Sequence, residues 1–345
     1  MRAMVYDSVG ATPQVREVPE PDCPSDGVVV QVAATGVCRS DWHAWRGHDP
    51  VRLPHIGGHE LAGTVVAVGP DVTRFFLGDR VTTPFVNGCG VCEFCTHGDA
   101  QVCPAQTQPG FTGPGSFAEQ VALHAADLNL VRLPSRMDSV TAAALGCRFA
   151  TAYRGLTAHG RVRPGDWVAV FGCGGVGLSA VLIARALGAR VVAVDVSAAA
   201  LSRATDCGAE ATVLSSDPAA RVREVTGGGA HVGVDALGSA ATAEASIRSL
   251  RRRGRHVQIG LLLGDAARVG LPMDLVITHE LEIHGSHGMA AHEYPALLRL
   301  VADQAVPLDR LIGSVISLDE APAALMGMDD LAPTRAGLTV IDLSR

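Results

Sequence analysis

The chain has 345 residues, a length that suits about two domains with a buried core each. Hydrophobic residues make up 48% of the chain and charged residues 18%, which excludes a disordered, collagen-like or coiled-coil protein. The net charge of −7 and the aromatic share of 4% argue against a nucleic-acid partner, because binding one needs a basic surface and stacking rings.

The first 150 residues predict short, Val-rich strands between Pro- and Gly-rich turns. A turn cluster at 22–27 precedes the first of them, and the expected strands are 28–32, 61–68 and 80–83. This pattern predicts an irregular, mostly β domain over residues 1–150.

From about residue 150, strands alternate with Ala-rich helices. The expected strands are 168–171, 191–194, 232–235, 256–260 and 281–285, and the expected helices are 177–187, 198–207 and 242–250. Because such alternation with short connections builds a parallel, doubly wound sheet, we expect an α/β domain over 151–288. The tail, 289–345, contains another expected strand at 337–343 and is expected to return to the first domain.

The sequence predicts a cytoplasmic protein without a membrane partner. An uncharged run at 167–184 contains four glycines, which fit a strand, a turn and a helix start better than a membrane span. The N-terminal residues meet an acid and a glycine before any apolar run, unlike a signal peptide. Nine cysteines, four of them within 89–103, favour metal ligation in a reducing compartment over disulfides.

A glycine-rich loop follows the expected strand 168–171 and leads into an apolar helix. A dinucleotide pyrophosphate would lie on the N-terminus of that helix, while the glycines permit a tight turn and close backbone approach. The residues expected to bind the cofactor are Gly172, Gly174, Gly175, Val176 and Gly177.

Asp195 directly follows the expected strand 191–194, roughly twenty residues after the glycine loop. A carboxylate at this sequence position accepts hydrogen bonds from the ribose hydroxyls of the cofactor. A 2′-phosphate there would meet like charge, so Asp195 predicts NAD(H) rather than NADP(H). The alternative is that Asp195 is the N-cap of the helix 198–207.

The cysteine cluster has the spacing Cys-x2-Cys-x2-Cys-x7-Cys. A tetrahedral zinc ion needs four soft donors that converge from a small loop, and this spacing provides them. With every position taken by protein, such a site is structural and stabilises a lobe, residues 88–104. The expected ligands are Cys89, Cys92, Cys95 and Cys103.

A second group of candidate ligands is dispersed along the chain: Cys38, His59 and Cys147. Taken singly, each is more often a buried thiol or a core histidine, and spacing alone does not unite them. However, Gly58-His59-Glu60-x2-Gly63-x5-Gly69 resembles the zinc-site motif of the zinc-dependent alcohol dehydrogenases in the medium-chain dehydrogenase/reductase family.

The resemblance covers the whole chain, because the Cys-Arg-Ser-Asp motif at 38–41, the cysteine lobe, the Gly-Cys pair at 146–147 and the glycine loop occur in family order. Trp42-His43-Ala44-Trp45 is similar to the yeast and bacterial tetrameric branch. The resemblance implies a GroES-like catalytic domain beside a Rossmann domain.

The resemblance also implies two zinc ions per subunit. Cys38, His59 and Cys147 would hold the catalytic ion and leave one position open for water or substrate. Glu60 would be a neighbouring or exchanging carboxylate of that ion, and Asp41 would orient His59.

The same resemblance implies a proton relay. Ser40 would take the proton from the alcohol and pass it through the nicotinamide ribose to His43, which releases it to solvent. The alternative for His43 is an ordinary surface histidine.

Further matches concern the cofactor and the substrate pocket. Arg39 and Arg335 match positions that contact the pyrophosphate, although Arg335 also fits a surface arginine. Trp45 and Phe85 match pocket-wall aromatics, although either fits the core. The arginine-rich run 251–255 is expected to be a cationic helix end.

The activity that these features imply is reversible hydride transfer between a primary or secondary alcohol and NAD⁺, giving an aldehyde or ketone. A homotetramer or a homodimer is expected. Two alternatives stay open: a zinc-independent carbonyl or enone reductase of the same fold, and a non-catalytic NAD-binding scaffold. The polyol branch fits less well, because it often has a carboxylate as third ligand and lacks the cysteine lobe.

Overall fold

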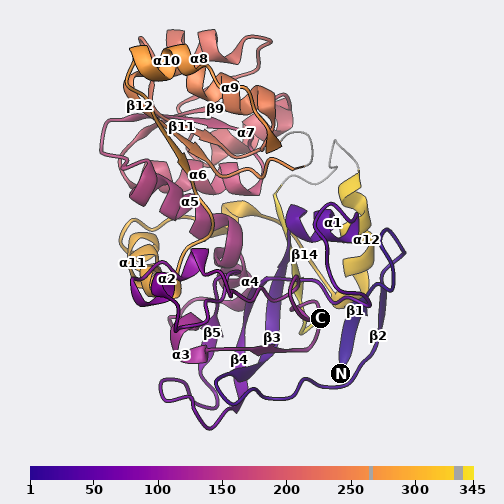
Figure 1. Cartoon of the computed structure of the whole chain (residues 1–345). Coiled ribbons are helices and arrows are strands. Elements are labelled where there is room, and N and C mark those ends of the chain that lie inside the picture. The colour runs from indigo at the N-terminus through magenta and orange to yellow at the C-terminus, as the bar shows by residue number, and fades with distance from the viewer. Residues whose placement is uncertain (264–266, 330–336) are drawn as a thin grey trace. The chain divides into compact units, whose positions relative to one another are not determined.

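The structure is a computed structural model that describes residues 1–263, 267–329 and 337–345. It divides into two compact units (Figure 1). The first unit comprises Met1–Ala150, Gly288–Ala296 and Ile312–Arg345, and the second comprises Thr151–His287 and Leu297–Leu311. Among the described residues, no helix has the length and apolar character needed to cross a membrane.

The second unit is built on a six-stranded sheet in which every neighbouring pair is parallel. The strand order is β10-β9-β8-β11-β12-β13, the Rossmann order, so the doubly wound sheet is confirmed. The strands are β8 (Trp167–Phe171), β9 (Arg190–Val194), β10 (Ala211–Val213), β11 (Ala230–Asp235), β12 (Leu250–Gln258) and β13 (Glu282–Gly285).

Helices pack on both faces of this sheet, which is why all five residues of β8 are buried. Helices α6 and α7 contact each other, and α8 and α9 contact each other. The helices are α6 (Gly175–Ala186), α7 (Ala198–Asp206), α8 (Pro218–Thr226), α9 (Ala240–Arg248) and α10 (Met273–Thr278).

The chain enters the second unit a second time after residue 296, where the sequence predicts one uninterrupted return to the first domain from 289. Leu308 and Leu311 are buried, and the turn η6 (Leu308–Leu311) contacts α6. Helix α11 (Tyr294–Asp303) leads into this segment. The physical reason for the second crossing is therefore burial of apolar side chains in the second unit.

The first unit contains a seven-stranded sheet and the small antiparallel pair β1 (Arg2–Val5) and β2 (Gln14–Glu17). All neighbours in the larger sheet are antiparallel except β14 and β15. This architecture confirms the mostly β domain. Its strands are β3 (Val28–Val37), β4 (Glu60–Val68), β5 (Arg80–Thr82), β6 (Gln120–Leu123), β7 (Val131–Arg132), β14 (Ile312–Ile316) and β15 (Leu338–Asp342).

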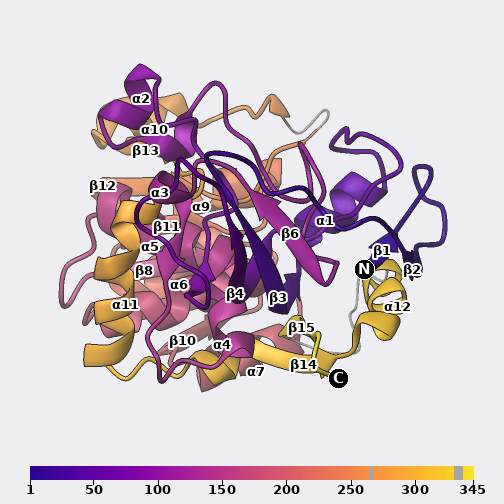
Figure 2. The same ribbon diagram turned by 90° about the horizontal axis from the view of Figure 1, so that it is seen from below.

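Strand β3 is the centre of the first unit, since it has neighbours along both edges (Figures 1 and 2). Strand β4 follows one edge, while β6 pairs with the first part of the other edge and β15 with the last part. Alternate side chains of β3, among them Val28, Val30 and Val32, enter a buried cluster with Leu61 and Val65 of β4.

Short helices complete the first unit. Helix α4 contacts β3, β4 and β15, and α12 contacts β3 and α1. The helices are α1 (Arg39–Trp45), α2 (Glu93–Thr96), α3 (Ala126–Asn129), α4 (Ser139–Ala143) and α12 (Ala321–Met326), and α5 (Ala150–Arg154) lies where the two units meet in sequence.

Candidate active site and metal centres

The antiparallel register of β3 and β4 explains how two distant candidate ligands meet. Gly36 near the end of β3 pairs with Glu60 at the start of β4. Cys38 follows β3 and His59 precedes β4, so the register brings these two side chains to the same end of the sheet. Cys147 joins them from the π-helical turn η2 (Leu145–Phe149).

The ligand atoms of Cys38, His59, Glu60 and Cys147 all lie within 4.8 Å of one another. Gly146 permits this approach, because a Cβ there would lie 3.2 Å from the Cα of Glu60. The structure therefore brings together residues that the sequence separates by more than a hundred positions.

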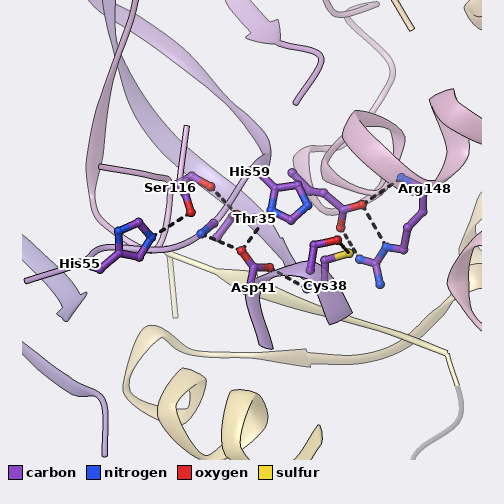
Figure 3. Close-up of polar contacts among 11 residues, drawn as sticks. Thr35, Cys38, Asp41, His55, His59, Ser116 and Arg148 are labelled. Atoms are coloured by element: carbon purple, nitrogen blue, oxygen red, sulfur yellow. Dashed lines mark hydrogen bonds and ion pairs between the residues drawn. The ribbon is translucent and has the colours of Figure 1, made fainter. Parts of the chain in front are cut away.

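His59 is oriented by Asp41 (Figure 3). Its Nδ1 lies 3.0 Å from Oδ1 of Asp41, while its buried Nε2 has no hydrogen-bond partner among the described residues. A neutral imidazole that donates from Nδ1 presents a lone pair at Nε2, as a metal-binding histidine does. The orphaned nitrogen beside two thiols fits a zinc ion.

Asp41 also fixes the backbone on both sides of the site. Its Oδ1 accepts a hydrogen bond of 3.0 Å from the N–H of Gly58, and its Oδ2 accepts one of 2.9 Å from the N–H of Cys38. Gly58 has φ +97, and a Cβ there would lie 2.6 Å from the backbone nitrogen of Phe117. One carboxylate thus holds the segments of two candidate ligands.

The two thiols of the site influence each other. Their shared hydrogen bond lowers the pKa of Cys38 well below its ordinary value and raises the pKa of Cys147. The lowered pKa favours the thiolate of Cys38, and a thiolate is the form of cysteine that binds metals.

Glu60 forms a buried ion pair with Arg148, a residue that the sequence analysis missed. Oε1 accepts hydrogen bonds from Nε of Arg148 at 2.9 Å and from its backbone N–H at 3.2 Å, and Nη2 pairs with Oε2. Gly36 leaves room for the pair, since a Cβ there would lie 2.3 Å from Oε2. Burial raises the pKa of Glu60, and the charge of Arg148 opposes that rise.

Two phenylalanine rings contact His59. The ring centroids of Phe111 and Phe85 lie 5.1 Å and 6.2 Å from that of the imidazole. Phe85 was expected near the substrate, while Phe111 was missed. Trp45 packs in a core cluster and donates from Nε1 to the carbonyl of Ala11 at 2.7 Å, as its alternative assignment to the core predicts.

The expected relay residues lie on α1. Ser40 Oγ is 3.7 Å from Sγ of Cys38. His43 follows Ser40 by three positions, a spacing that places both on one helix face, and is half-buried. Its Nδ1 lies 3.0 Å from Nδ1 of His48, which the sequence analysis also missed.

Of the two arginines expected at the pyrophosphate, the structure describes only Arg39. Arg39 is exposed, lies 4.6 Å above the Trp42 ring and donates to the carbonyl of Met328. Arg335 lies outside the described residues.

The thiols of the cysteine lobe converge, with all four Sγ atoms within 4.8 Å of one another. Sγ of Cys92 lies 3.6 Å from Sγ of Cys103, too far for a disulfide. Asn129 braces the loop by exchanging two hydrogen bonds of 2.9 Å with the backbone of Gly88. The four cysteines, all free thiols, are Cys89, Cys92, Cys95 and Cys103.

The lobe already favours one thiolate. The backbone N–H groups of Val91 and Cys92 lower the pKa of Cys89 to about 6, whereas burial raises the pKa of Cys95 to about 12. A bound cation would offset the energetic cost of burying the remaining thiols in their charged thiolate form. The four donors therefore fit a zinc ion.

In the second unit, the glycine loop joins β8 to α6. Gly172 has φ +91, and a Cβ on Gly177 would lie 1.8 Å from the carbonyl oxygen of Gly172, so both positions require glycine. A Cβ on Gly174 would meet no atom within 4 Å, which leaves open space at the N-cap of α6. Gly175 and Val176 form the first turn of that helix.

Asp195 follows β9 and ties it to the glycine loop. Its Oδ2 accepts a hydrogen bond of 2.7 Å from the N–H of Cys173, and its Oδ1 accepts one of 2.8 Å from the N–H of Ser197. The N-cap of α7 is Ser197, so the alternative assignment of Asp195 as that cap is wrong.

Comparison with known proteins agrees with this geometry. The family model for the alcohol dehydrogenase GroES-like domain matches residues 24–135, and that for zinc-binding dehydrogenases matches residues 175–303. An alcohol dehydrogenase of Geobacillus stearothermophilus is 36% identical over 290 residues, which cover 83% of this chain and 84% of the relative.

Solved structures show the same fold. The alcohol dehydrogenase of Thermus sp. ATN1 matches with a TM-score of 0.91 and 30% identity, covering 99% of each chain. A zinc-binding dehydrogenase of Sinorhizobium meliloti, solved with NADP bound, matches with a TM-score of 0.87 and 29% identity over 99% of this chain and 98% of that one. The chain belongs to the zinc-binding alcohol dehydrogenases of the medium-chain dehydrogenase/reductase family.

Proposed function

We propose that the protein is an NAD(H)-linked alcohol dehydrogenase that binds one catalytic and one structural zinc ion per chain. The observation that carries the proposal is the convergence of Cys38, Cys147 and the orphaned Nε2 of His59 in one buried site. Three such donors leave a fourth position for a substrate oxygen, as in catalytic zinc sites.

The residues around this site have separable tasks. Bound zinc supplies Lewis-acid polarisation of the substrate oxygen. Asp41 keeps the Nε2 lone pair of His59 directed into the site through its contact with Nδ1. Phe85 and Phe111 place apolar rings beside the imidazole, where they exclude water from the substrate.

In this proposal, residues of α1 remove the proton from the alcohol substrate. Ser40 accepts the proton of the alcohol hydroxyl, supported by its place 3.7 Å from Sγ of Cys38. His43, on the same helix face and half-buried, carries the proton toward solvent. A bound nicotinamide cofactor would supply the hydride acceptor for this chemistry.

The structural zinc assignment predicts that Cys95→Ser lowers stability. We expect the variant to bind one zinc ion fewer than the wild type and to lose ~4 kcal/mol or more of unfolding free energy, because loss of a metal belongs to the large destabilising changes. Zinc analysis and urea unfolding measure both effects. Cys23→Ser, at an exposed thiol outside both clusters, is the matched control. Wild-type zinc content and stability in Cys95→Ser would contradict the assignment.

The cofactor assignment predicts that Asp195→Ser weakens NAD⁺ binding by about 10- to 100-fold, as the loss of hydrogen bonds to a charged group does. Binding of NADP⁺ should weaken less or improve, because its phosphate no longer meets a carboxylate. The ratio of the two KM values measures the change, with Asp206→Ser, an exposed aspartate of the same unit, as control. The choice between NAD⁺ and NADP⁺ needs this measurement, because the similar structure from S. meliloti was solved with NADP bound. An unchanged ratio refutes the role of Asp195.

We further propose a cytoplasmic homotetramer, with a homodimer as the alternative. The absence of a disulfide among the nine cysteines, all of which lie in the described residues, supports a reducing compartment. The tetramer is supported by the short stretch between Cys103 and Cys147 and by the likeness to the tetrameric branch. The molar mass, measured by light scattering as the protein elutes from a size-exclusion column, distinguishes a tetramer from a dimer.

The function is tested with purified protein and a panel of aliphatic, aromatic and polyol alcohols. We expect two zinc ions per chain by elemental analysis and formation of NADH with at least one alcohol. Turnover of activated alkenes by zinc-free protein would instead identify the reductase alternative. A zinc-loaded, folded preparation that is inert toward every alcohol and carbonyl compound would overturn the proposal.

A further inference from the structure

A second histidine lies against the expected relay histidine. Nδ1 of His48 is 3.0 Å from Nδ1 of His43, and the two ring centroids are 5.3 Å apart. His48 is exposed, whereas His43 is half-buried. The pair thus joins a half-buried ring to one that faces solvent.

The end of α1 explains why the two rings meet. Gly47 has φ +75, and its N–H donates to the carbonyl of Ala44 at 3.0 Å, while the N–H of His48 donates to the carbonyl of His43 at 2.9 Å. These two bonds form a Schellman motif, which places the residue after the glycine beside the helix residue five positions earlier. In this motif an apolar contact frequently fills this place, and here two imidazoles fill it.

Trp42 holds the pair from one side. Its ring contacts His43 and His48 edge-on, with centroid distances of 4.9 Å and 5.3 Å. Trp42 is itself anchored, because its Nε1 donates to Oδ1 of Asp329 at 2.7 Å. The imidazoles are therefore confined by packing as well as by their mutual hydrogen bond.

The contact between two Nδ1 atoms constrains the protons of the pair. One Nδ1 must carry a proton and the other must accept it, so the bond exists only while at least one ring is neutral. If both rings were imidazolium, two N–H groups would face each other and two positive charges would repel. The pair can therefore hold one extra proton between its two Nδ1 atoms, whereas a second extra proton would break the bond between them.

The charged groups that influence the pKa of His43 lie in α1 and in the residues directly before and after it. Burial, His48 and Arg39 lower the pKa of His43, whereas Cys38 and Asp49 raise it. The net effect on the pKa of His43 is downward, which favours release of a proton from its ring. A relay group that gives up its proton readily needs an acceptor nearby, and His48 is in contact with it.

We propose that His48 is the proton-carrying partner of His43, so that the pair, rather than His43 alone, delivers the substrate proton to water. The inference rests on the proposed function of this site. A proton bound at Nε2 of His43 drives the proton on its Nδ1 across to Nδ1 of His48, and His48 releases the proton on its own Nε2 to water.

One proton enters the pair and one leaves it in this step, and only N–H bonds change. Between turnovers the half-buried ring of His43 and the exposed ring of His48 exchange protons with water, which restores the starting arrangement. His48 acts through His43 and is therefore a positioning and proton-carrying residue that need not touch substrate.

The test is proton release in a single turnover of alcohol oxidation by the zinc-loaded enzyme, followed with a pH-indicator dye. His48→Gln keeps a side-chain acceptor for Nδ1 of His43 but cannot carry a proton through a ring. We expect release to slow roughly 10-fold, less than the ~100-fold contributed by a directly acting base. Imidazole added to the buffer should restore the rate. The matched control is His124→Gln, at an exposed histidine of the same unit that contacts Asp26.

A double variant distinguishes action through His43 from a separate effect. His43→Gln combined with His48→Gln should release protons no more slowly than His43→Gln alone, because the second residue has lost its donor. Unchanged release in His48→Gln, no rescue by imidazole, or an additive loss in the double variant would overturn the proposal.

Nitrogen NMR of the histidine rings gives a readout independent of turnover. In the resting wild-type protein the pair should take up one shared proton before a second, more acidic step, and His48→Gln should leave His43 titrating singly. Two independent titrations in the wild type refute the pair. A wild-type enzyme that oxidises no alcohol contradicts the proposed function instead, while the NMR titration still decides the pair.

Discussion

Replacing Cys147 by serine should reduce kcat for alcohol oxidation by more than ~100-fold. Removing a residue that only hydrogen-bonds to a metal ligand costs up to ~100-fold in activity, and removing a ligand itself should cost more. The thiol converges with Cys38 and His59 in the candidate catalytic site. Serine is a poor zinc ligand at neutral pH because its hydroxyl keeps its proton. The variant should therefore lose catalytic zinc and turnover together.

The fold should survive this substitution, because serine is close to cysteine in size. Gly146 still permits the close approach to β4, and the hydroxyl of Tyr294 still donates to the carbonyl of Gly146 at 3.2 Å. NAD⁺ affinity, measured by titration calorimetry, should stay near the wild-type value, since the glycine loop lies in the second unit. Cys23→Ser serves as the control with full activity. Near-normal kcat with retained zinc in Cys147→Ser would exclude Cys147 as a ligand.

Replacing Arg148 by methionine should cost about 3–5 kcal/mol of unfolding free energy, the usual result of removing one partner from a buried ion pair. Glu60 is 0% exposed and Arg148 is 7% exposed, so the carboxylate that remains has no water to solvate it. Chemical denaturation of the zinc-loaded protein measures the loss. The same change at Arg248, whose partner Glu244 is exposed on α9, should cost less than about 1 kcal/mol.

The double variant Glu60→Gln with Arg148→Met separates charge from packing. If the penalty comes from an uncompensated charge, neutralising Glu60 should restore much of the lost stability, and the two changes should be strongly non-additive. An additive loss would show instead that Arg148 contributes through its contacts with the surrounding core.

Features contained in one short segment were predictable from the sequence. The glycine loop with its strand and helix, and the cysteine lobe, each have all their members close together in the chain, so spacing alone carries the geometry. Helix α8 was missed although its signals are local: Asp217 caps it, Pro218 opens it and Gly227 ends it with φ +69.

The rest depends on contacts between distant segments. Cys38, His59 and Cys147 meet through strand register and a π-helical turn, and only a family resemblance could unite them beforehand. Arg148 did leave a signal, as an isolated charge in the apolar stretch Leu145–Phe149 that requires a buried partner. The arginine run 251–255 was wrongly expected to end a helix. It lies in β12, because α9 ends at Arg248 and the chain pairs again from Leu250.

The pairing of β15 with β3 has a consequence for biosynthesis. Residues 34–37, directly before Cys38, hydrogen-bond with Thr339–Asp342. While a ribosome is still making the second unit, that stretch of nascent chain has an uncovered strand edge, the kind of surface that recruits other chains into aggregates. A fragment cut after residue 150 would keep this edge exposed, so we expect it to aggregate more readily than the full chain.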